Sequence, residues 1–200
     1  MKAVIFDIGK VLVRFEWEAF TNRLFDGNKT RIDAVNAAVW GDLLWVELDR
    51  GVMEEAEVLS AIRRKAEGFE EDIDLLIEHI GEVVEKCDYA IPWIREVKAA
   101  GHPVYFLSNY SDFLRRSNPE ALDFIPETDG GVWSDEAKCI KPDPAIYQAL
   151  CDTYHLDPAD CIFIDDNPDN VKGAVDFGMD AILFTDYETA RKQLDHKLLK

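Results

Sequence analysis

Four short apolar runs, in which hydrophobic and polar residues do not alternate, constrain the fold of this chain more than any other feature. A strand that is buried on both faces has this pattern, because neither face meets water. We therefore predict β-strands at residues 3–7, 103–108, 161–166 and 180–185. Helical patterns precede the last three of them, at residues 92–100, 143–154 and 170–177. Strands that alternate with helices predict an α/β fold with a doubly wound parallel sheet and right-handed crossovers.

The segment between the first two strands breaks this alternation. Residues 16–85 carry amphipathic helical patterns, one of which ends at Gly51 in the manner of a helix C-cap. A segment of this length is too long for a crossover connection. We therefore predict an all-helical cap at 16–85, inserted into an α/β core domain that consists of residues 1–15 and 86–200.

The charge of the chain excludes some classes of partner. Forty acidic residues against 22 Lys and Arg give a net charge of −18, so we expect neither nucleic acid nor an anionic membrane as a partner. No apolar run is long enough to span a bilayer, and the N-terminus does not resemble a secretion signal. The four cysteines form no Cys-x-x-Cys pair. We expect a cytoplasmic protein, as a monomer or a weak homodimer.

Polar side chains follow three of the predicted strands. Asp7 ends the first, Ser108–Asn109 the second and Asp165–Asp166 the third. Each could be a helix N-cap or a turn former. However, the carboxyl ends of parallel strands meet at one edge of the sheet, so three such ends would bring mutually repelling carboxylates together. A divalent cation with oxygen ligands would neutralise them, and Lys141 could supply a second positive charge unless it is an exposed loop lysine.

The stretches around these residues resemble the four motifs of the haloacid dehalogenase-like hydrolase superfamily, in order and spacing. They are Val-Ile-Phe-Asp-Ile-Gly-Lys-Val-Leu at 4–12, Leu-Ser-Asn at 107–109, Lys-Pro at 141–142 and Ile-Asp-Asp-Asn-Pro-Asp-Asn at 164–170. Within the superfamily, the chain is similar to the small bacterial sugar phosphatases typified by alpha-D-glucose-1-phosphate phosphatase, which also carry Asp-x-Gly in the first motif. The resemblance covers nearly the whole chain.

The resemblance implies a nucleophile and a metal site. Asp7 would attack phosphorus and form an aspartyl-phosphate that water later hydrolyses. Mg²⁺ would be held by the Asp7 carboxylate, the backbone carbonyl of Gly9 and Asp166. Because side chains alternate along a strand, Asp165 and Asp166 should not both face one ion. We expect Asp165, together with Asn170, to support the site without contacting the metal.

The resemblance also implies how the phosphate is bound. Ser108 and the backbone N–H of Asn109 would donate hydrogen bonds to the phosphoryl oxygens. Lys141 would pair with the same oxygens and with Asp7, which stabilises the charge that develops in the transition state.

The sequence departs from the commonest phosphatase pattern at Gly9. Most phosphatases of the family have an aspartate there, which protonates the leaving group and then activates water, a contribution of ~100- to 10,000-fold. Glycine fits a phosphatase for substrates with an acidic leaving group such as a sugar 1-phosphate, a 2-haloacid dehalogenase, or a non-catalytic binding or regulatory module. We predict a Mg²⁺-dependent phosphomonoester hydrolase of a small metabolite, because the Asp165–Asp166 pair favours a metal and Asp7, Ser108 and Lys141 are all present.

Specificity should come from the cap, which faces the leaving group in this architecture. Arg14, Trp17, Trp45 and Arg50 are candidates, although each could equally be a core or surface residue. Lys10 stands where the family commonly has Gly or Asn. Its side chain either points to solvent or reaches the leaving group and partly compensates for the missing aspartate.

Overall fold

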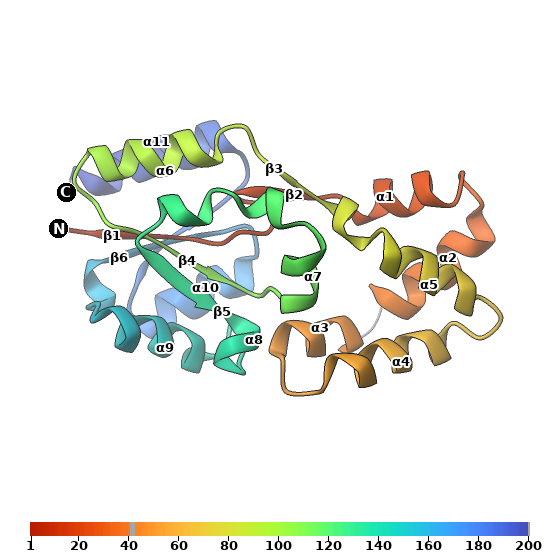
Figure 1. Ribbon diagram of the computed structural model, residues 1–200. Coiled ribbons are helices and arrows are strands. Elements are labelled where there is room, and N and C mark those ends of the chain that lie inside the picture. The colour runs from red at the N-terminus through yellow and green to blue at the C-terminus, as the bar shows by residue number, and fades with distance from the viewer. Residues whose placement is uncertain (41–42, 200) are drawn as a thin grey trace.

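The computed structural model describes residues 1–40 and 43–199 and shows a five-stranded parallel sheet with β1 at its centre (Figure 1). In spatial order the strands are β5 (Gly130–Trp133), β4 (Val104–Ser108), β1 (Ala3–Phe6), β6 (Cys161–Asp165) and β7 (Asp180–Leu183). Each of the four predicted apolar runs is a strand. Each also ends at or before its predicted last residue, so that Asp7 and Asp166 lie just beyond β1 and β6.

Helices cover both faces of the sheet, which explains why β1 has no polar position. Val4 and Phe6 pack on the side of α6 (Ala90–Ala99) and α11 (Tyr187–Leu198), and the Phe6 ring meets Trp93 edge-on at 4.7 Å. Ala3 and Ile5 pack on the other side, against α9 (Pro144–Tyr154) and α10 (Pro168–Phe177). The predicted α/β fold with covered strands is confirmed.

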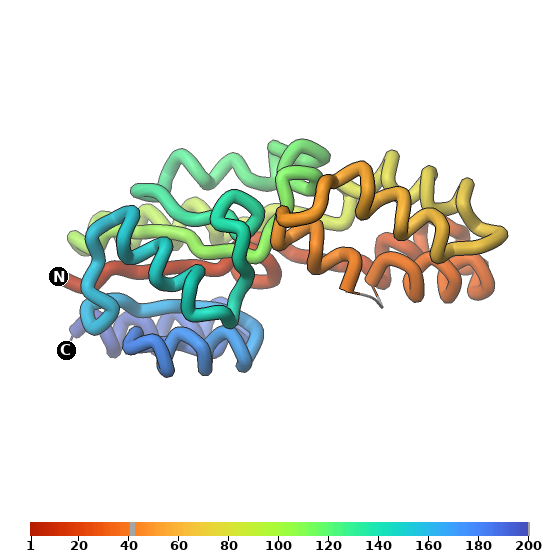
Figure 2. Tube along the Cα trace, turned by 90° about the horizontal axis from the view of Figure 1, so that it is seen from below, coloured from red at the N-terminus to blue at the C-terminus, as the bar shows by residue number. Residues whose placement is uncertain are grey.

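The helical insertion lies beyond the carboxyl ends of the strands (Figures 1 and 2). Its elements are α1 (Trp17–Leu24), α2 (Lys29–Val39), α3 (Leu43–Arg50), α4 (Glu55–Lys65), α5 (Glu70–Glu78) and the 3₁₀ turn η1 (Ile80–Val83). The chain enters the insertion through β2 (Val13–Phe15) and leaves it through β3 (Val84–Lys86), and these two strands pair antiparallel. We propose residues 16–85 as the extent of the cap.

Several elements differ from the sequence predictions. Residues 13–15 form the strand β2, which was not predicted, and the first helix of the insertion begins at Trp17. The edge strand β5 begins with two glycines and so lacks an apolar run. A Cβ at Gly131 would collide with the ring of Phe106, so the close packing of this ring needs glycine. The remaining elements are short connections: α7 (Asp112–Ser117), η2 (Pro119–Leu122), η3 (Ile125–Glu127), α8 (Ser134–Ala137) and η4 (Pro158–Asp160).

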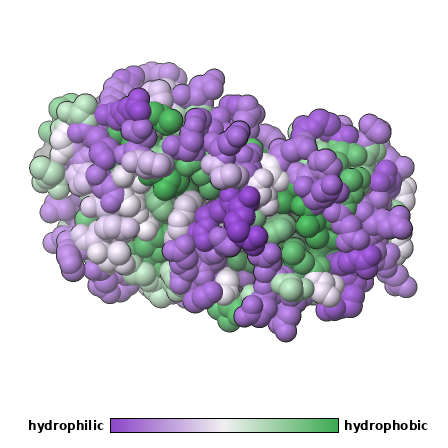
Figure 3. Space-filling view, in the orientation of Figure 1, coloured by the Kyte–Doolittle hydropathy of each residue, from purple (hydrophilic) through white to green (hydrophobic). Residues whose placement is uncertain are grey.

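The surface agrees with the acidic composition of the chain. Hydrophilic residues cover most of the face seen in Figure 3, over both the sheet domain and the helical insertion. Within residues 1–40 and 43–199, no helix combines the length and the apolar character needed to cross a membrane.

Candidate active site

The polar residues at the carboxyl ends of β1, β4 and β6 lie together around Lys141. The Lys141 Nζ atom is 2.8 Å from Asp7 Oδ1 and 2.7 Å from Asp165 Oδ2. The Ser108 hydroxyl donates to Asp7 Oδ1 at 2.8 Å, and so does the Ile8 backbone N–H at 2.7 Å. Asp7, Lys141 and Asp165 are only 7%, 3% and 0% exposed. Lys141 is therefore a buried member of this cluster and not an exposed loop lysine.

Asn109 fixes the loop that carries Lys141. Its side-chain amide donates to the Lys141 carbonyl oxygen at 3.1 Å and accepts from the Lys141 backbone N–H at 2.8 Å. This pair of hydrogen bonds ties the end of β4 to the segment before α9. The side chain of Asn109 thus has a positioning role that the sequence did not reveal.

Asp165 and Asp166 occupy different environments. The Asp165 carboxylate accepts hydrogen bonds from Lys141, from the Asn170 amide at 3.1 Å and from the Asn167 backbone N–H at 2.8 Å. Asp166 is partly exposed and lines a cavity. One carboxylate oxygen each from Asp7, Asp165 and Asp166 lies within 4.8 Å of the others. These three carboxylates offer oxygen ligands of the kind that Mg²⁺ and Ca²⁺ prefer.

The carboxylates of this cluster outnumber its one ammonium group, so the site carries excess negative charge. Burial and the neighbouring Asp165 raise the pKa of Asp7 to about 7, against the lowering effect of Lys141. Burial and the charge of Asp165 also raise the pKa of Asp166. Burial lowers the pKa of Lys141, but the carboxylates of Asp7 and Asp165 outweigh it, so that the pKa is raised and the ammonium form is favoured. Three carboxylates against one ammonium leave a deficit of positive charge.

A cavity of about 320 Å³ opens beside these residues, between the sheet and the helical insertion. The residues that line it are Asp7, Gly9, Lys10, Phe15, Trp45, Asp49, Asn109, Tyr110, Leu114, Asp166, Asn167 and Asn170. The hydroxyl of Tyr110 is buried and has no hydrogen-bond partner within the described part of the chain. Buried hydroxyls normally have a partner, so this group is an exception at the wall of the cavity.

The four cap residues considered for specificity do not all reach this cavity. Trp45 lines it, whereas Arg14 forms an ion pair with Glu85 at 2.8 Å and Arg50 lies 3.4 Å from Glu47. Trp17 packs against Trp40 and lines a neighbouring pocket, which shares Lys10 and Phe15 with the cavity. Lys10 is exposed, has a φ of 58° and lines the cavity.

Asp49 of α3 is a cavity residue that the sequence analysis missed. It lies four positions after Trp45, and residues at this spacing share one face of a helix. This spacing was the signal that could have identified it. Burial, together with the nearby charge of Asp135, raises the pKa of Asp49 to about 7.

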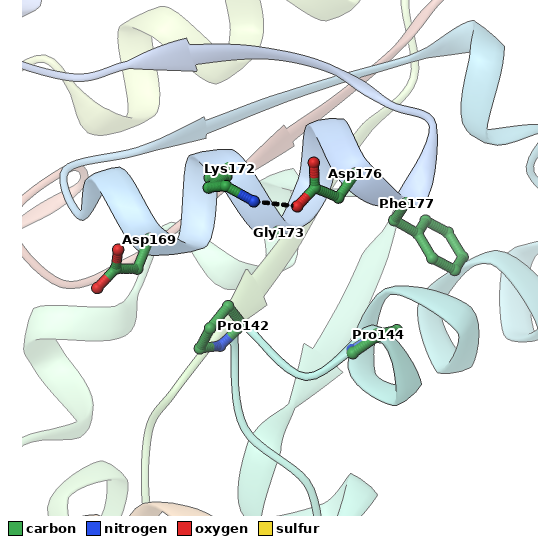
Figure 4. Close-up of a pocket in the computed structure, with 7 residues that line it drawn as sticks. All are labelled: Pro142, Pro144, Asp169, Lys172, Gly173, Asp176 and Phe177. Atoms are coloured by element: carbon green, nitrogen blue, oxygen red, sulfur yellow. Dashed lines mark hydrogen bonds and ion pairs between the residues drawn. The ribbon is translucent and has the colours of Figure 1, made fainter.

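A second, larger groove lies on the far side of the Lys141 loop. It is lined by Pro142 and Pro144 on one side and by Asp169, Lys172, Gly173, Asp176 and Phe177 on the other (Figure 4). Lys172 is paired with Asp176 along α10. This groove does not include the carboxylate cluster, so the cavity beside Asp7 is the candidate active site.

Comparison with known sequences identifies the family. A sequence model of haloacid dehalogenase-like hydrolases matches residues 1–178. The chain belongs to the haloacid dehalogenase-like hydrolases. The predicted superfamily is thus confirmed. None of the relatives described below is a sugar phosphatase by name.

The relatives within this family have different activities. The chain is 26% identical to flavin mononucleotide hydrolase 1 of Arabidopsis thaliana over 76% of its own length and 61% of that protein. It is 32% identical to (S)-2-haloacid dehalogenase 4A of Burkholderia cepacia over 44% of its length and 38% of that protein. It is 27% identical to Phosphatase MT3486 of Mycobacterium tuberculosis, over 92% of its length and 87% of that protein. The first two relatives are thus covered over less than two thirds of their length.

The fold is shared with solved structures. A HAD family enzyme from Bacteroides thetaiotaomicron, in complex with magnesium and inorganic phosphate, has a TM-score of 0.71 at 20% identity. The match covers 91% of this chain and 93% of that one. At this identity the comparison establishes the α/β fold with its helical insertion.

Proposed function

We propose that the protein is a Mg²⁺-dependent phosphomonoester hydrolase that acts on a small phosphorylated metabolite through an aspartyl-phosphate on Asp7. The observation that carries this proposal is the convergence of Ser108 and Lys141 on one oxygen of a buried Asp7 carboxylate. These contacts fix the orientation of the carboxylate at the edge of the cavity. Lys141 favours the ionised form of Asp7 by lowering its pKa, and a carboxylate in this form can attack an electrophile without a helper base.

The residues of the cluster would have different roles in the reaction. Asp7 attacks phosphorus as the bond to the leaving oxygen breaks. The Ser108 hydroxyl, the Asn109 backbone N–H and the Lys141 ammonium bind the phosphoryl oxygens, where negative charge accumulates. Asn109 also holds Lys141 in place through its side chain.

The donor set fits a magnesium ion. Asp7, Asp166 and the Gly9 carbonyl would hold it, because the Asp165 carboxylate is already bonded to Lys141 and Asn170. When bound, the ion supplies positive charge that offsets the carboxylates and the substrate phosphate. Three carboxylates and one ammonium lack two positive charges, the charge of one such ion. The magnesium and phosphate held by the Bacteroides enzyme of the same fold support this assignment.

We propose a sugar phosphate as the substrate. A cavity of about 320 Å³ is at the lower end of the ~300–1,000 Å³ typical of ligand sites, which suits a small metabolite. Lys10, Asp49 and Asn167 line the cavity and bring polar side chains that can bind hydroxyls. With glycine at position 9, the first motif favours a sugar 1-phosphate, whose anomeric oxygen leaves more readily than an ordinary alcohol. Faster turnover of sugar 6-phosphates than of 1-phosphates would contradict this choice.

We extend the proposal to the setting of the enzyme. It would act on its small substrate as a monomer or weak homodimer, without nucleic acid or membrane. Its four free cysteines suit the reducing conditions of the cytoplasm.

The experiment is a phosphate-release screen over sugar phosphates, nucleotides, flavin mononucleotide and phosphorylated small acids, with Mg²⁺ or with EDTA. We expect release that requires Mg²⁺ and that Asp7→Asn abolishes. Asp152→Asn, a change at an exposed aspartate on α9, is the matched control and should retain activity.

The same screen tests the alternatives. The 32% identity to a 2-haloacid dehalogenase makes this activity the second candidate. Halide release from 2-haloacids that persists in EDTA would establish it and overturn the phosphatase proposal. Magnesium binding without hydrolysis of any ester would indicate a non-catalytic module.

A further inference from the structure

The structure leaves a gap at Gly9, where many phosphatases of the family carry an acid. A Cβ built at Gly9 would meet no atom within 4 Å. The backbone next to the nucleophile therefore borders open space in the cavity. Protonation of the leaving oxygen requires a group from elsewhere in the cavity wall.

Asp49 lines the same cavity and belongs to α3 of the insertion. Among the described residues, three carboxylates line the cavity: Asp7, Asp49 and Asp166. Asp7 is the proposed nucleophile and Asp166 belongs to the proposed metal site, which leaves Asp49. Asp49 is only partly buried, so its carboxylate is within reach of a bound molecule. The leaving group of a phosphate on Asp7 would face this helix.

Contacts with the sheet domain fix the end of α3 that carries Asp49. The Ser134 hydroxyl donates to the Asp49 carbonyl oxygen at 2.5 Å, and Lys138 Nζ donates to the Gly51 carbonyl oxygen at 2.5 Å. Gly51 approaches α8 so closely that a Cβ on it would lie 2.5 Å from the Asp135 carbonyl oxygen. These two hydrogen bonds and the close approach of Gly51 fix the end of α3 against the sheet domain, and with it the position of Asp49.

We propose that Asp49 is the catalytic acid and base of this enzyme, in place of the carboxylate that Gly9 lacks. This inference rests on the phosphatase function proposed above. In the first step Asp7 forms an O–P bond, the bond from phosphorus to the leaving oxygen breaks, and the protonated Asp49 gives its proton to that oxygen. In the second step the Asp49 carboxylate takes a proton from water. The water oxygen then bonds to phosphorus as the bond between phosphorus and the Asp7 oxygen breaks. With the proton taken from water, Asp49 is back in the protonated form in which it began.

The surroundings of Asp49 suit both protonation states. Burial and the charges of Asp135 and Asp7 raise its pKa, to about 7, while the Ser111 backbone N–H and Lys141 lower it. An acid and a base are thus both populated near neutral pH, the condition under which one group can serve both steps. Ionisable groups from several elements surround it. They are Asp135 on α8, Arg115 on α7, Tyr110 in the loop before α7, Asp7 and Lys141 of the carboxylate cluster, and Glu47 and Arg50 on α3 itself.

The test compares esters whose leaving groups differ in their need for a proton. For Asp49→Asn, we expect kcat/KM for a sugar 6-phosphate to fall by ~100- to 10,000-fold. With p-nitrophenyl phosphate, whose leaving group needs no proton, we expect kcat/KM to change by less than about 3-fold. A burst of nitrophenolate, about one per active site, should precede slow turnover, because the aspartyl-phosphate then lacks a base.

Two further variants make the test specific. Glu47→Gln removes a carboxylate from the same helix outside the cavity and should leave both esters unaffected. Adding Gly9→Asp to Asp49→Asn places a carboxylate in the open space at position 9, and we expect it to restore sugar 6-phosphate turnover by about 10-fold or more.

The outcomes separate the two proposals. An equal loss on both esters, or no loss on either, with an active wild-type enzyme overturns the role of Asp49 and leaves the phosphatase function intact. A wild-type enzyme that hydrolyses no ester overturns both. If the inference holds, the leaving group needs no acidity of its own, and ordinary alkyl phosphates join sugar 1-phosphates as substrates.

Discussion

Substitution of Lys141 by methionine tests how the carboxylate cluster is stabilised. Methionine keeps much of the length of the side chain but removes the ammonium that lies 2.8 Å from Asp7 and 2.7 Å from Asp165. All three groups are less than a tenth exposed, so water cannot replace the lost charge. The variant is left with two adjacent carboxylates in a buried site.

The expected loss of stability is large. Removing one partner from a buried ion pair costs about 3–5 kcal/mol of unfolding free energy, because the remaining charge is uncompensated. In a protein of about 200 residues, 1 kcal/mol shifts Tm by about 2–4 °C. We therefore expect Tm to fall by roughly 6–20 °C in the absence of metal.

The loss should depend on pH. Without the ammonium, each carboxylate raises the pKa of the other above its value in the unfolded chain. A carboxyl with a raised pKa in the folded state binds a proton more tightly there than in the unfolded state. Its contribution to stability is complete below the unfolded pKa and is lost as the pH rises through the folded pKa. Lys141→Met should thus be less destabilised at pH 5 than at pH 8.

The measurement is urea unfolding in EDTA at both pH values, followed by a Mg²⁺ titration. Mg²⁺ should raise the stability of the variant more than that of the wild type, since it restores positive charge. Lys172→Met is the control, because the Lys172–Asp176 pair is exposed on α10 and its removal should have no measurable effect. A loss below about 1 kcal/mol at pH 8, or one that does not change with pH, would refute the argument.

Two other substitutions probe the packing that supports the site. Gly51→Ala places a Cβ 2.5 Å from the Asp135 carbonyl oxygen at a φ of +65°, so urea unfolding should show a loss of about 1–3 kcal/mol. It should also lower kcat for a sugar 6-phosphate more than for p-nitrophenyl phosphate, and equal rates with wild type would argue against the docking of α3. Trp93→Ala removes a 1% exposed ring between Phe6 and Tyr187 and should cost about 3–5 kcal/mol. A loss under about 1 kcal/mol would mean that the core relaxes around the cavity.

Much of the sheet domain could be predicted from the sequence because its strands are covered on both faces. The run that ends at Asp7 has no polar position, and the same is true of the run that ends at Asp165. Topology then determines that such strand ends share one edge, which is why Ser108 was placed beside them correctly. Local pattern and a general rule of parallel sheets were sufficient there.

The edge strand and the hairpin at the insertion needed the tertiary structure. No strand was predicted at Gly130 and Gly131, yet they pair with β4, and the rings of Tyr154 and Phe106 lie close to their backbone. The short strands β2 and β3 are far apart in sequence, so no local signal links them.

The cavity itself was decided by tertiary packing. The sequence placed Asp7 and Lys141 in the site, but it could not show which face of α3 meets the sheet domain. A helical pattern distinguishes an apolar face from a polar one, whereas the helix that it packs against depends on contacts between distant segments. Those contacts, at Ser134 and Lys138, hold the end of α3, from which Asp49 lines the cavity beside Asp7. The sequence alone thus predicted that Asp7 and its charged partners lie together, and the packing of α3 decided which side chains of the insertion line the cavity beside them.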